Sequence, residues 1–344
     1  MSITNLTVRR LRAARLAMDA TVDQATRGIV SAWSSAWAEL TAEWEAAIDD
    51  LLAAGQWPTR SQLLRANRAT DALRHTAARL QELAENAGVT ITDGLPQIVQ
   101  QAQEWERTLA ASQLPSGAMS GPNAHVTWSR DVSAVDAIVA RTTGQVESLL
   151  RPLPRQQAAV MRSVLIRGVA VGDSPREAAR IMLRRLGGVF DGGRWRAENI
   201  ARTEMLDAHR ASALAARKAN ADLLSGWEWS ATLDRRTCPA CLAMDGQRFD
   251  TETPGPEGHQ QCRCTALPIT KSWRDLGFNV DEPVSTRKSG REWFDEQPEH
   301  VQLDIMGPGR FAAWKRGDLR WDQIPMIRHT DGWRDSIVVR PLAA

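Results

Sequence analysis

The sequence has no long apolar run and almost no net charge. No stretch of 18 apolar residues occurs in the 344-residue chain, and the N-terminal segment carries Arg9, Arg10 and Arg12 where a signal peptide needs an apolar run. The net charge is +2, so no global field favours a nucleic acid or a membrane as partner. We therefore expect a protein that is made in the cytoplasm and does not bind membranes.

The motifs of several enzyme classes are absent. None of the six histidines is followed two positions later by Glu, as a zinc deaminase requires, and there is no H-E-x-x-H, P-loop or G-x-S-x-G. Glu204 and Asp234 are better explained by salt bridges than as an acid–base pair. We predict no catalytic residue, no enzymatic activity and no small-molecule substrate.

Cysteine is absent everywhere except in residues 238–264. Cys238 and Cys241 form a C-x-x-C knuckle, Cys262 and Cys264 form a C-x-C pair, and His259 lies three residues before the second pair. Zinc takes four tetrahedral sulfur or nitrogen ligands, and closely spaced pairs supply two from each of two turns. We expect a structural Zn²⁺ held by four of these five side chains.

Two other states of the four thiols stay open. They could be reduced thiols in a small core, or disulfides if the protein meets oxidising conditions. A cysteine nucleophile with His259 as its base is a poorer explanation, because a cluster of five candidate ligands suits binding better than catalysis.

Residues 6–53 contain no proline and one glycine, and they carry an 11-residue repeat of apolar side chains. Eleven residues make three helical turns, which keeps such a row on one face of a helix roughly 70 Å long. A stripe rich in Trp favours a core helix of a bundle; the alternative is packing along another copy or along a partner protein. The rows are Leu11, Val22, Trp33 and Trp44; Met18, Ile29, Leu40 and Leu51; and Ala14, Ala25, Ala36 and Ala47.

The remaining helices are expected between glycine and proline breaks. We place them at 59–87, 93–112, 131–151, 154–167, 174–186 and 194–219, the first with a Thr59 capping box and the fifth with a Ser174 cap. Shorter helices are expected at 291–297, 299–305 and 310–315, with residues 333–344 as an extended arm. A core of Trp293, Phe294, Phe311, Trp314, Trp321 and Trp333 is expected there.

After Asn220 the apolar period changes from helical to two. Trp227, Trp229 and Ala231 alternate with Glu228 and Ser230, which indicates a half-buried strand. Its expected partners are residues 247–249 and 263–267, and the sheet is too thin to bury a core alone. We expect the 194–219 helix to dock on it, with Arg202 and Glu204 pairing with Asp234, Arg235 or Arg236.

These patterns predict an α+β fold, predominantly α, with long N-terminal helices plus a small antiparallel β module with a Cys/His cluster. The expected ranges are a helical rod or hairpin region at 1–112, a linker at 113–130, a helical part at 131–225, the β module at 226–268 and a mixed short-helix region at 269–344.

Residues 174–268 resemble the phage minor head (head morphogenesis) proteins of the Mu F-like family. That family has a helix with an Arg-Thr-Glu segment, a Trp strand, a C-x-x-C turn with a D-G, and a His-x-x-Cys-Arg-Cys return. The matching positions are Arg202, Thr203, Glu204, Trp229, Asp234, Thr237, Cys238, Cys241, Asp245, Gly246, His259, Cys262, Arg263 and Cys264.

The resemblance implies a structural minor capsid protein of a tailed phage. Its expected partners are the portal protein and other copies of itself, its place is the head interior or portal vertex of the virion, and its role is head assembly or DNA packaging and delivery. One alternative is a zinc-stabilised nucleic-acid-binding module, with Arg235, Arg236, Arg248 and Arg263 on phosphates. Another is a metal-dependent hydrolase, which needs an open coordination position.

Overall fold

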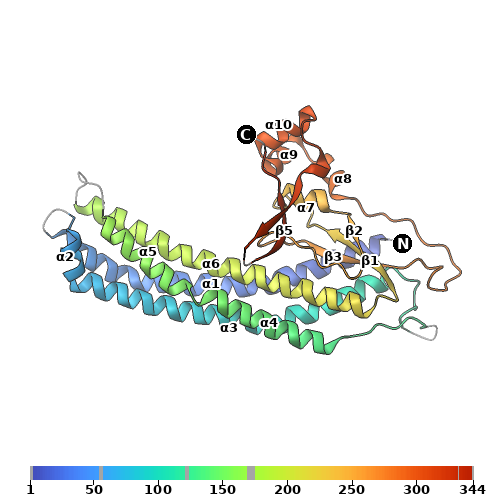
Figure 1. Ribbon diagram of the computed structural model, residues 1–344, viewed down its shortest axis with the longest axis horizontal. Coiled ribbons are helices and arrows are strands. Elements are labelled where there is room, and N and C mark those ends of the chain that lie inside the picture. The colour runs from blue at the N-terminus through green and yellow to red at the C-terminus, as the bar shows by residue number, and fades with distance from the viewer. Residues whose placement is uncertain (1–2, 54–56, 121–123, 169–174, 332, 343–344) are drawn as a thin grey trace. The chain divides into compact units, whose positions relative to one another are not determined.

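The computed structural model describes residues 3–53, 57–120, 124–168, 175–331 and 333–342. Helices hold 64% of the residues, which confirms the predominantly α, α+β class (Figure 1). The helices are α1 (Asn5–Leu52), α2 (Arg60–Arg65), α3 (Asn67–Ala111), α4 (Val132–Leu150), α5 (Leu153–Arg167), α6 (Pro175–Ala219), α7 (Pro239–Met244), α8 (Gly290–Asp295), α9 (Glu299–Met306), α10 (Pro308–Arg316) and the short 3₁₀ helix η1 (Trp321–Gln323). The strands are β1 (Leu224–Ser230), β2 (Arg248–Phe249), β3 (Thr265–Thr270), β4 (Pro325–Thr330) and β5 (Trp333–Val339).

The chain forms two compact units, each assembled from separate segments. Unit 1 consists of Met1–Ala20, Pro96–Val139 and Leu206–Ala344, and unit 2 of Thr21–Leu95 and Ala140–Met205. Each unit combines segments that are far apart in the sequence, whereas the ranges expected from the sequence are consecutive. The two divisions are of different kinds, and the expected domain boundaries stay a prediction. Within the described residues, no helix combines the length and apolar composition needed to cross a bilayer.

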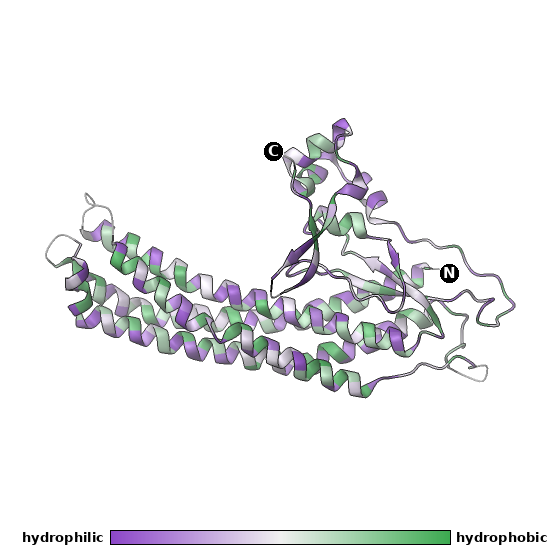
Figure 2. Cartoon of the chain, viewed as in Figure 1, coloured by the Kyte–Doolittle hydropathy of each residue, from purple (hydrophilic) through white to green (hydrophobic). Residues whose placement is uncertain are grey.

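The long first helix and its stripe are confirmed. All the repeat positions are buried except Ala14, which is half-buried. In unit 2, Trp33 packs on Phe190 with ring centroids 6.5 Å apart, and the Trp44 indole N–H donates to Thr76 Oγ1 at 3.0 Å. The stripe therefore faces the core of its own chain, as a bundle helix requires. Figure 2 shows that hydrophobic and hydrophilic residues are intermixed along the long helices.

Two of the helix breaks expected at glycines are wrong. Helix α3 runs through Gly88 and Pro96, and α6 runs through Gly187 and Gly188. A glycine costs a helix only about 1 kcal/mol, which the burial of a continuous apolar face offsets. At Gly187 the missing side chain has a use, since a β-carbon there would lie 3.1 Å from the Trp37 ring.

The two helix starts that the sequence predicts, at Thr59 and Ser174, have different outcomes. The Thr59 capping box is present, although it caps the short helix α2 rather than a helix that continues to residue 87. Helix α6 begins at Pro175 as expected, but the Ser174 cap lies outside the described residues.

In unit 1, β1 lies at the centre of a three-stranded antiparallel sheet of order β2–β1–β3. Trp227 faces Phe249 of β2 on one side and Pro268 of β3 on the other, so both expected partners are confirmed. The strand is not half-buried, however. Glu228 and Ser230, on the face expected to meet solvent, are 5% and 0% exposed.

The C-terminal region contains the three expected short helices and one element that sequence reasoning missed. Strands β4 and β5 form an antiparallel hairpin, so residues 333–339 are a paired strand rather than a free arm. Phe294 and Phe311 lie in a buried apolar cluster to which α7, α8, α9 and α10 contribute, and Trp293, Trp314 and Trp321 pack against it, as expected. The side chain of Trp333 lies outside the described residues.

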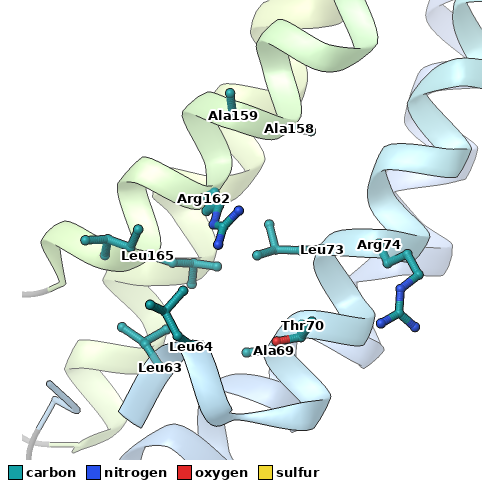
Figure 3. A pocket seen from close by; sticks show the side chains of 11 residues that line it. Leu63, Leu64, Ala69, Thr70, Leu73, Arg74, Ala158, Ala159, Arg162 and Leu165 are labelled. Atoms are coloured by element: carbon teal, nitrogen blue, oxygen red, sulfur yellow. The ribbon is translucent and has the colours of Figure 1, made fainter. Parts of the chain in front are cut away.

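Unit 2 also has a hollow of about 420 Å³ between α2, α3 and α5 (Figure 3). Its described lining is apolar apart from Thr70, Arg74 and Arg162. No carboxylate, histidine or cysteine belongs to that lining, so it offers no acid, base or nucleophile.

Replacing Trp33 with Ala tests the interpretation that the α1 stripe packs in the core. Trp33 is 1% exposed, and removing a fully buried Trp typically lowers the free energy of unfolding by about 3–5 kcal/mol. Trp195, which is 64% exposed on α6, is the matched control. Trp195→Ala should change the free energy of unfolding by less than about 0.5 kcal/mol. Urea unfolding followed by circular dichroism measures both. Equal effects would contradict a buried stripe.

Candidate metal centre

The first sulfur-bearing turn starts helix α7. Cys238 is the N-cap residue, its sulfur accepts a hydrogen bond from the Cys241 N–H at 3.4 Å, and Pro239 occupies the first turn. The helix ends at Asp245, and Gly246 follows with φ +90°, a backbone conformation that favours glycine. This short helix directs Cys238 and Cys241 to one side.

The second turn leads into β3. The Cys262 N–H donates to the His259 carbonyl at 3.1 Å, which folds the segment back just before the strand. Cys262 and Cys264 are both 2% exposed and pack in one cluster with Trp227 and Trp229 of β1.

The two turns meet, as the sequence predicts. His259 Nε2 lies 3.3 Å from Cys238 Sγ and 3.7 Å from Cys241 Sγ, and Cys241 Sγ lies 3.7 Å from Cys262 Sγ. The ligand atoms of Cys264, Cys241 and Cys262 are all within 4.8 Å of one another. All four cysteines are free thiols in this structure. The five candidate ligands therefore form one cluster; that they bind a metal stays a prediction.

Protons within the cluster are shared between neighbours. Hydrogen bonding from Cys241, followed by that from His259, lowers the pKa of Cys238 to about 5. The hydrogen bond to Cys238, with the charges of Cys262 and Cys238, raises the pKa of His259 to about 9. Hydrogen bonds lower the pKa of Cys262, while donation to Cys238 raises that of Cys241 and burial raises that of Cys264. The cluster thus combines anionic sulfur with donors whose protons a cation can replace.

Helix α6 docks on the C-x-C segment, but through other residues than those expected. Arg210 is buried, and its guanidinium donates to the carbonyls of Cys262 and Cys264 and to Asp207. Arg202 pairs instead with Asp23 at 2.8 Å. A buried arginine that binds backbone carbonyls fixes the path of the chain, a role that residue spacing alone does not reveal.

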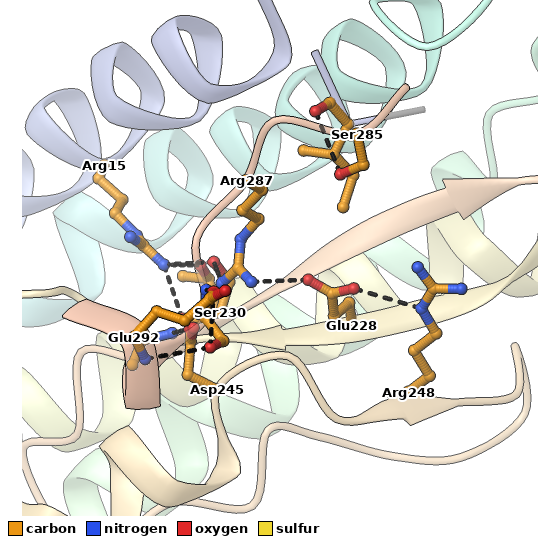
Figure 4. Close-up of polar contacts among 12 residues, drawn as sticks. Arg15, Glu228, Ser230, Asp245, Arg248, Ser285, Arg287 and Glu292 are labelled. Carbon is orange, nitrogen blue, oxygen red and sulfur yellow. Dashed lines mark hydrogen bonds and ion pairs between the residues drawn. The ribbon is translucent and has the colours of Figure 1, made fainter. Parts of the chain in front are cut away.

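A buried ionic network covers the opposite face of β1 (Figure 4). The Arg15 guanidinium donates to Ser230 Oγ at 2.8 Å, and burial lowers the pKa of Arg15 to about 10. Arg287 contacts Glu228 Oε1 at 2.8 Å and Asp245 Oδ1 at 2.6 Å. Sequence reasoning missed this network, although the D-G turn and the polar alternation in β1 marked two of its members.

The four arginines proposed for nucleic acid differ in their surroundings. Arg235 and Arg236 are exposed on the turn before α7. Arg263 makes a bidentate ion pair with Asp234, with both distances 2.8 Å, and Arg248 pairs with Glu228 at 3.3 Å. Two of the four guanidinium groups thus already bind carboxylates of the same chain, and phosphate binding by this set stays a prediction.

Gly258→Ala tests how tightly the second turn is held. A β-carbon at Gly258 would overlap Cys262 Sγ, so the variant displaces that sulfur or the turn. We expect a loss of about 1–3 kcal/mol in the free energy of unfolding, the range for overpacking a core. Gly188→Ala is the matched control, since nothing lies within 4 Å of its added carbon and α6 should gain up to about 1 kcal/mol. If both variants had the same free energy of unfolding as the native protein, Gly258 would not be packed tightly against Cys262.

His209 makes unit 1 sensitive to acid. It is 2% exposed, packs edge-on against Trp105, and has a pKa lowered to about 3, chiefly by burial and then by Arg210 and Arg217. The unfolded chain therefore binds this proton near pH 6.5 and the native chain does not, so the contribution of neutral His209 is complete above pH 6.5 and falls with pH below it.

The expected slope is about 1.4 kcal/mol per pH unit between pH 6.5 and 3. Urea unfolding at a series of pH values should show a shallower decline for His209→Phe than for the native protein. Parallel curves for His209→Phe and the native protein would show that His209 titrates normally.

Comparison with known proteins adds one finding. Residues 159–267 match the family described as Phage Mu protein F like protein. The match spans most of α5, then α6, β1, both sulfur-bearing turns, β2 and the first half of β3. Searches of curated proteins and of solved structures found no match. The part of the chain that contains the Cys/His cluster is therefore similar to the family described as Phage Mu protein F like protein.

Proposed function

We propose that the protein is a structural minor capsid protein of a tailed phage, acting in head morphogenesis. The supporting observation is the family match over residues 159–267, which contains every position on which the sequence resemblance rests. The proposed location is the virion, and the proposed partners are other head components.

Within the head we propose association with the portal protein, a role in head assembly or DNA packaging and delivery, and contacts with further copies of the chain. The support is the family resemblance. The α1 stripe adds none, because its apolar rows are buried in the chain's own core. Contacts with a portal would have to use other surfaces.

A hydrolase is poorly supported by the described residues. The hollow between α2, α3 and α5 is lined without acids, histidines or cysteines, and a second hollow in unit 2 is lined by Glu85 and Glu147 but by no histidine or cysteine. In the Cys/His cluster, Cys241, Cys262 and Cys264 are each 2% exposed, which leaves little room for a water and a substrate beside a metal.

The nucleic-acid alternative has one point in its favour, the exposure of Arg235 and Arg236. Two exposed arginines supply only a small part of the electrostatic free energy of phosphate binding. We therefore rank head structure first.

Co-expression with the portal protein of the same phage tests the proposal. We expect the two proteins to co-purify, and quantitative mass spectrometry of purified heads to find the chain there. DNA affinity, measured by fluorescence anisotropy at several salt concentrations, should be weak and unchanged in an Arg235→Glu, Arg236→Glu double variant. Absence from heads, together with salt-dependent DNA binding that the double variant loses, would favour the nucleic-acid module instead.

A further inference from the structure

The spacing of the Cys/His cluster fits a tetrahedral metal site. With zinc–sulfur bonds of about 2.3 Å and zinc–nitrogen bonds of about 2.0–2.1 Å, tetrahedral geometry puts two sulfurs about 3.8 Å apart and a sulfur and a nitrogen about 3.5 Å apart. Cys241 and Cys262 have their sulfurs 3.7 Å apart, and His259 Nε2 lies 3.3 and 3.7 Å from the two knuckle sulfurs. A disulfide would need a sulfur–sulfur distance of about 2.0 Å.

His259 is oriented as a ligand. Its Nδ1 lies 2.7 Å from the Gln260 carbonyl, so this nitrogen carries the proton that it donates. Once Nε2 gives up its own proton, its lone pair faces Cys238 and Cys241. A metal-ligating histidine almost always donates its other ring nitrogen to such a carbonyl or carboxylate, which fixes the tautomer and the ring plane.

The five donors are not equivalent. His259 groups with Cys238 and Cys241, and Cys264 groups with Cys241 and Cys262. Cys262 Sγ lies 3.7 Å from Cys241 Sγ, the sulfur that belongs to both groups. Cys264 packs in one apolar cluster with Trp229 and Ala266, and its sulfur lies within 4.8 Å of the sulfurs of Cys241 and Cys262.

We propose that Cys238, Cys241, His259 and Cys262 form a closed site for one structural Zn²⁺, with Cys264 outside the coordination sphere. This inference rests on the geometry and holds whether or not the protein is a head component. Three thiolates and Zn²⁺ carry a net charge of −1, and the guanidinium of Arg210, which also pairs with Asp207, lies against the carbonyls of Cys262 and Cys264. Four thiolates would bury a second negative charge at additional cost.

The ligand set selects the metal. Thiolate and imidazole in tetrahedral geometry suit zinc, whereas calcium and magnesium take oxygen ligands in larger or octahedral shells. Four protein ligands leave no position for water, so the site stabilises the fold rather than carrying out chemistry. Cys238 and His259 are only half-buried, which gives the ion a way in.

The site would also hold helix α6 in place. Arg210 binds the carbonyls of Cys262 and Cys264, so the backbone that carries one ligand is the surface on which the helix docks. Metal loss should loosen β1, α7 and β3 together.

The test uses the full-length protein, purified under reducing conditions with zinc. We expect one zinc per chain by elemental mass spectrometry, and three sulfurs with one nitrogen around it by X-ray absorption spectroscopy. Cys238→Ser and His259→Gln should lose stoichiometric zinc, while Cys264→Ser, the matched control within the cluster, keeps it. His329→Gln, at an exposed position, should keep it as well.

Three results would overturn the proposal. The native protein could contain no zinc, it could contain a disulfide that labelling of free thiols reveals, or its zinc could have four sulfur ligands, with zinc lost in Cys264→Ser and kept in His259→Gln. The absorption spectrum is measured on the native protein, so it decides the ligand set even if a variant does not fold. A failed zinc site would leave the head proposal standing, because that rests on the family match.

Discussion

Three cysteine sulfurs and one imidazole from two turns of the chain are joined by contacts of 3.3–3.7 Å beside β1. His259 contacts the sulfurs of Cys238 and Cys241, and Cys241 contacts that of Cys262. The sheet they adjoin has three strands, one of them only two residues long, so it cannot bury an adequate core by itself. The convergence of the turns supplies what the sheet lacks, and α7, Asp245 and β3 all take their positions from it.

Two sets of buried arginines attach the rest of unit 1 to this centre. Arg210 of α6 binds the carbonyls on the cysteine side of the sheet, while Arg15 and Arg287 bind Ser230, Glu228 and Asp245 on the other. Buried guanidinium groups are costly to strip of water unless their hydrogen bonds are satisfied, so such contacts specify one arrangement. The α1 helix, the sheet and the segment that holds Arg287 are therefore fixed together.

Some of this could be predicted from sequence, and the reasons are physical. The 11-residue repeat predicted α1 and its buried stripe because eleven residues make three turns of a helix, which keeps the apolar side chains on one face. The spacing of the cysteines predicted that the two turns meet. Gly88 and Gly187 misled because packing overrode a small helix penalty. The alternation of apolar and polar residues in β1 predicts that Glu228 and Ser230 face solvent. They are buried instead, because they bind arginines that are distant in the sequence. The β4–β5 hairpin was missed although Asp331-Gly332, a strong hairpin signal, stands between its strands.

Hydrogen exchange of the full-length protein, with and without a zinc chelator, tests most directly whether the two turns hold the module together. The account predicts that chelation speeds amide exchange throughout 226–268 and in α6 around Arg210, while the unit 2 parts of α1 and α3 keep their protection. Unchanged protection of 226–268 after the metal is removed would contradict it.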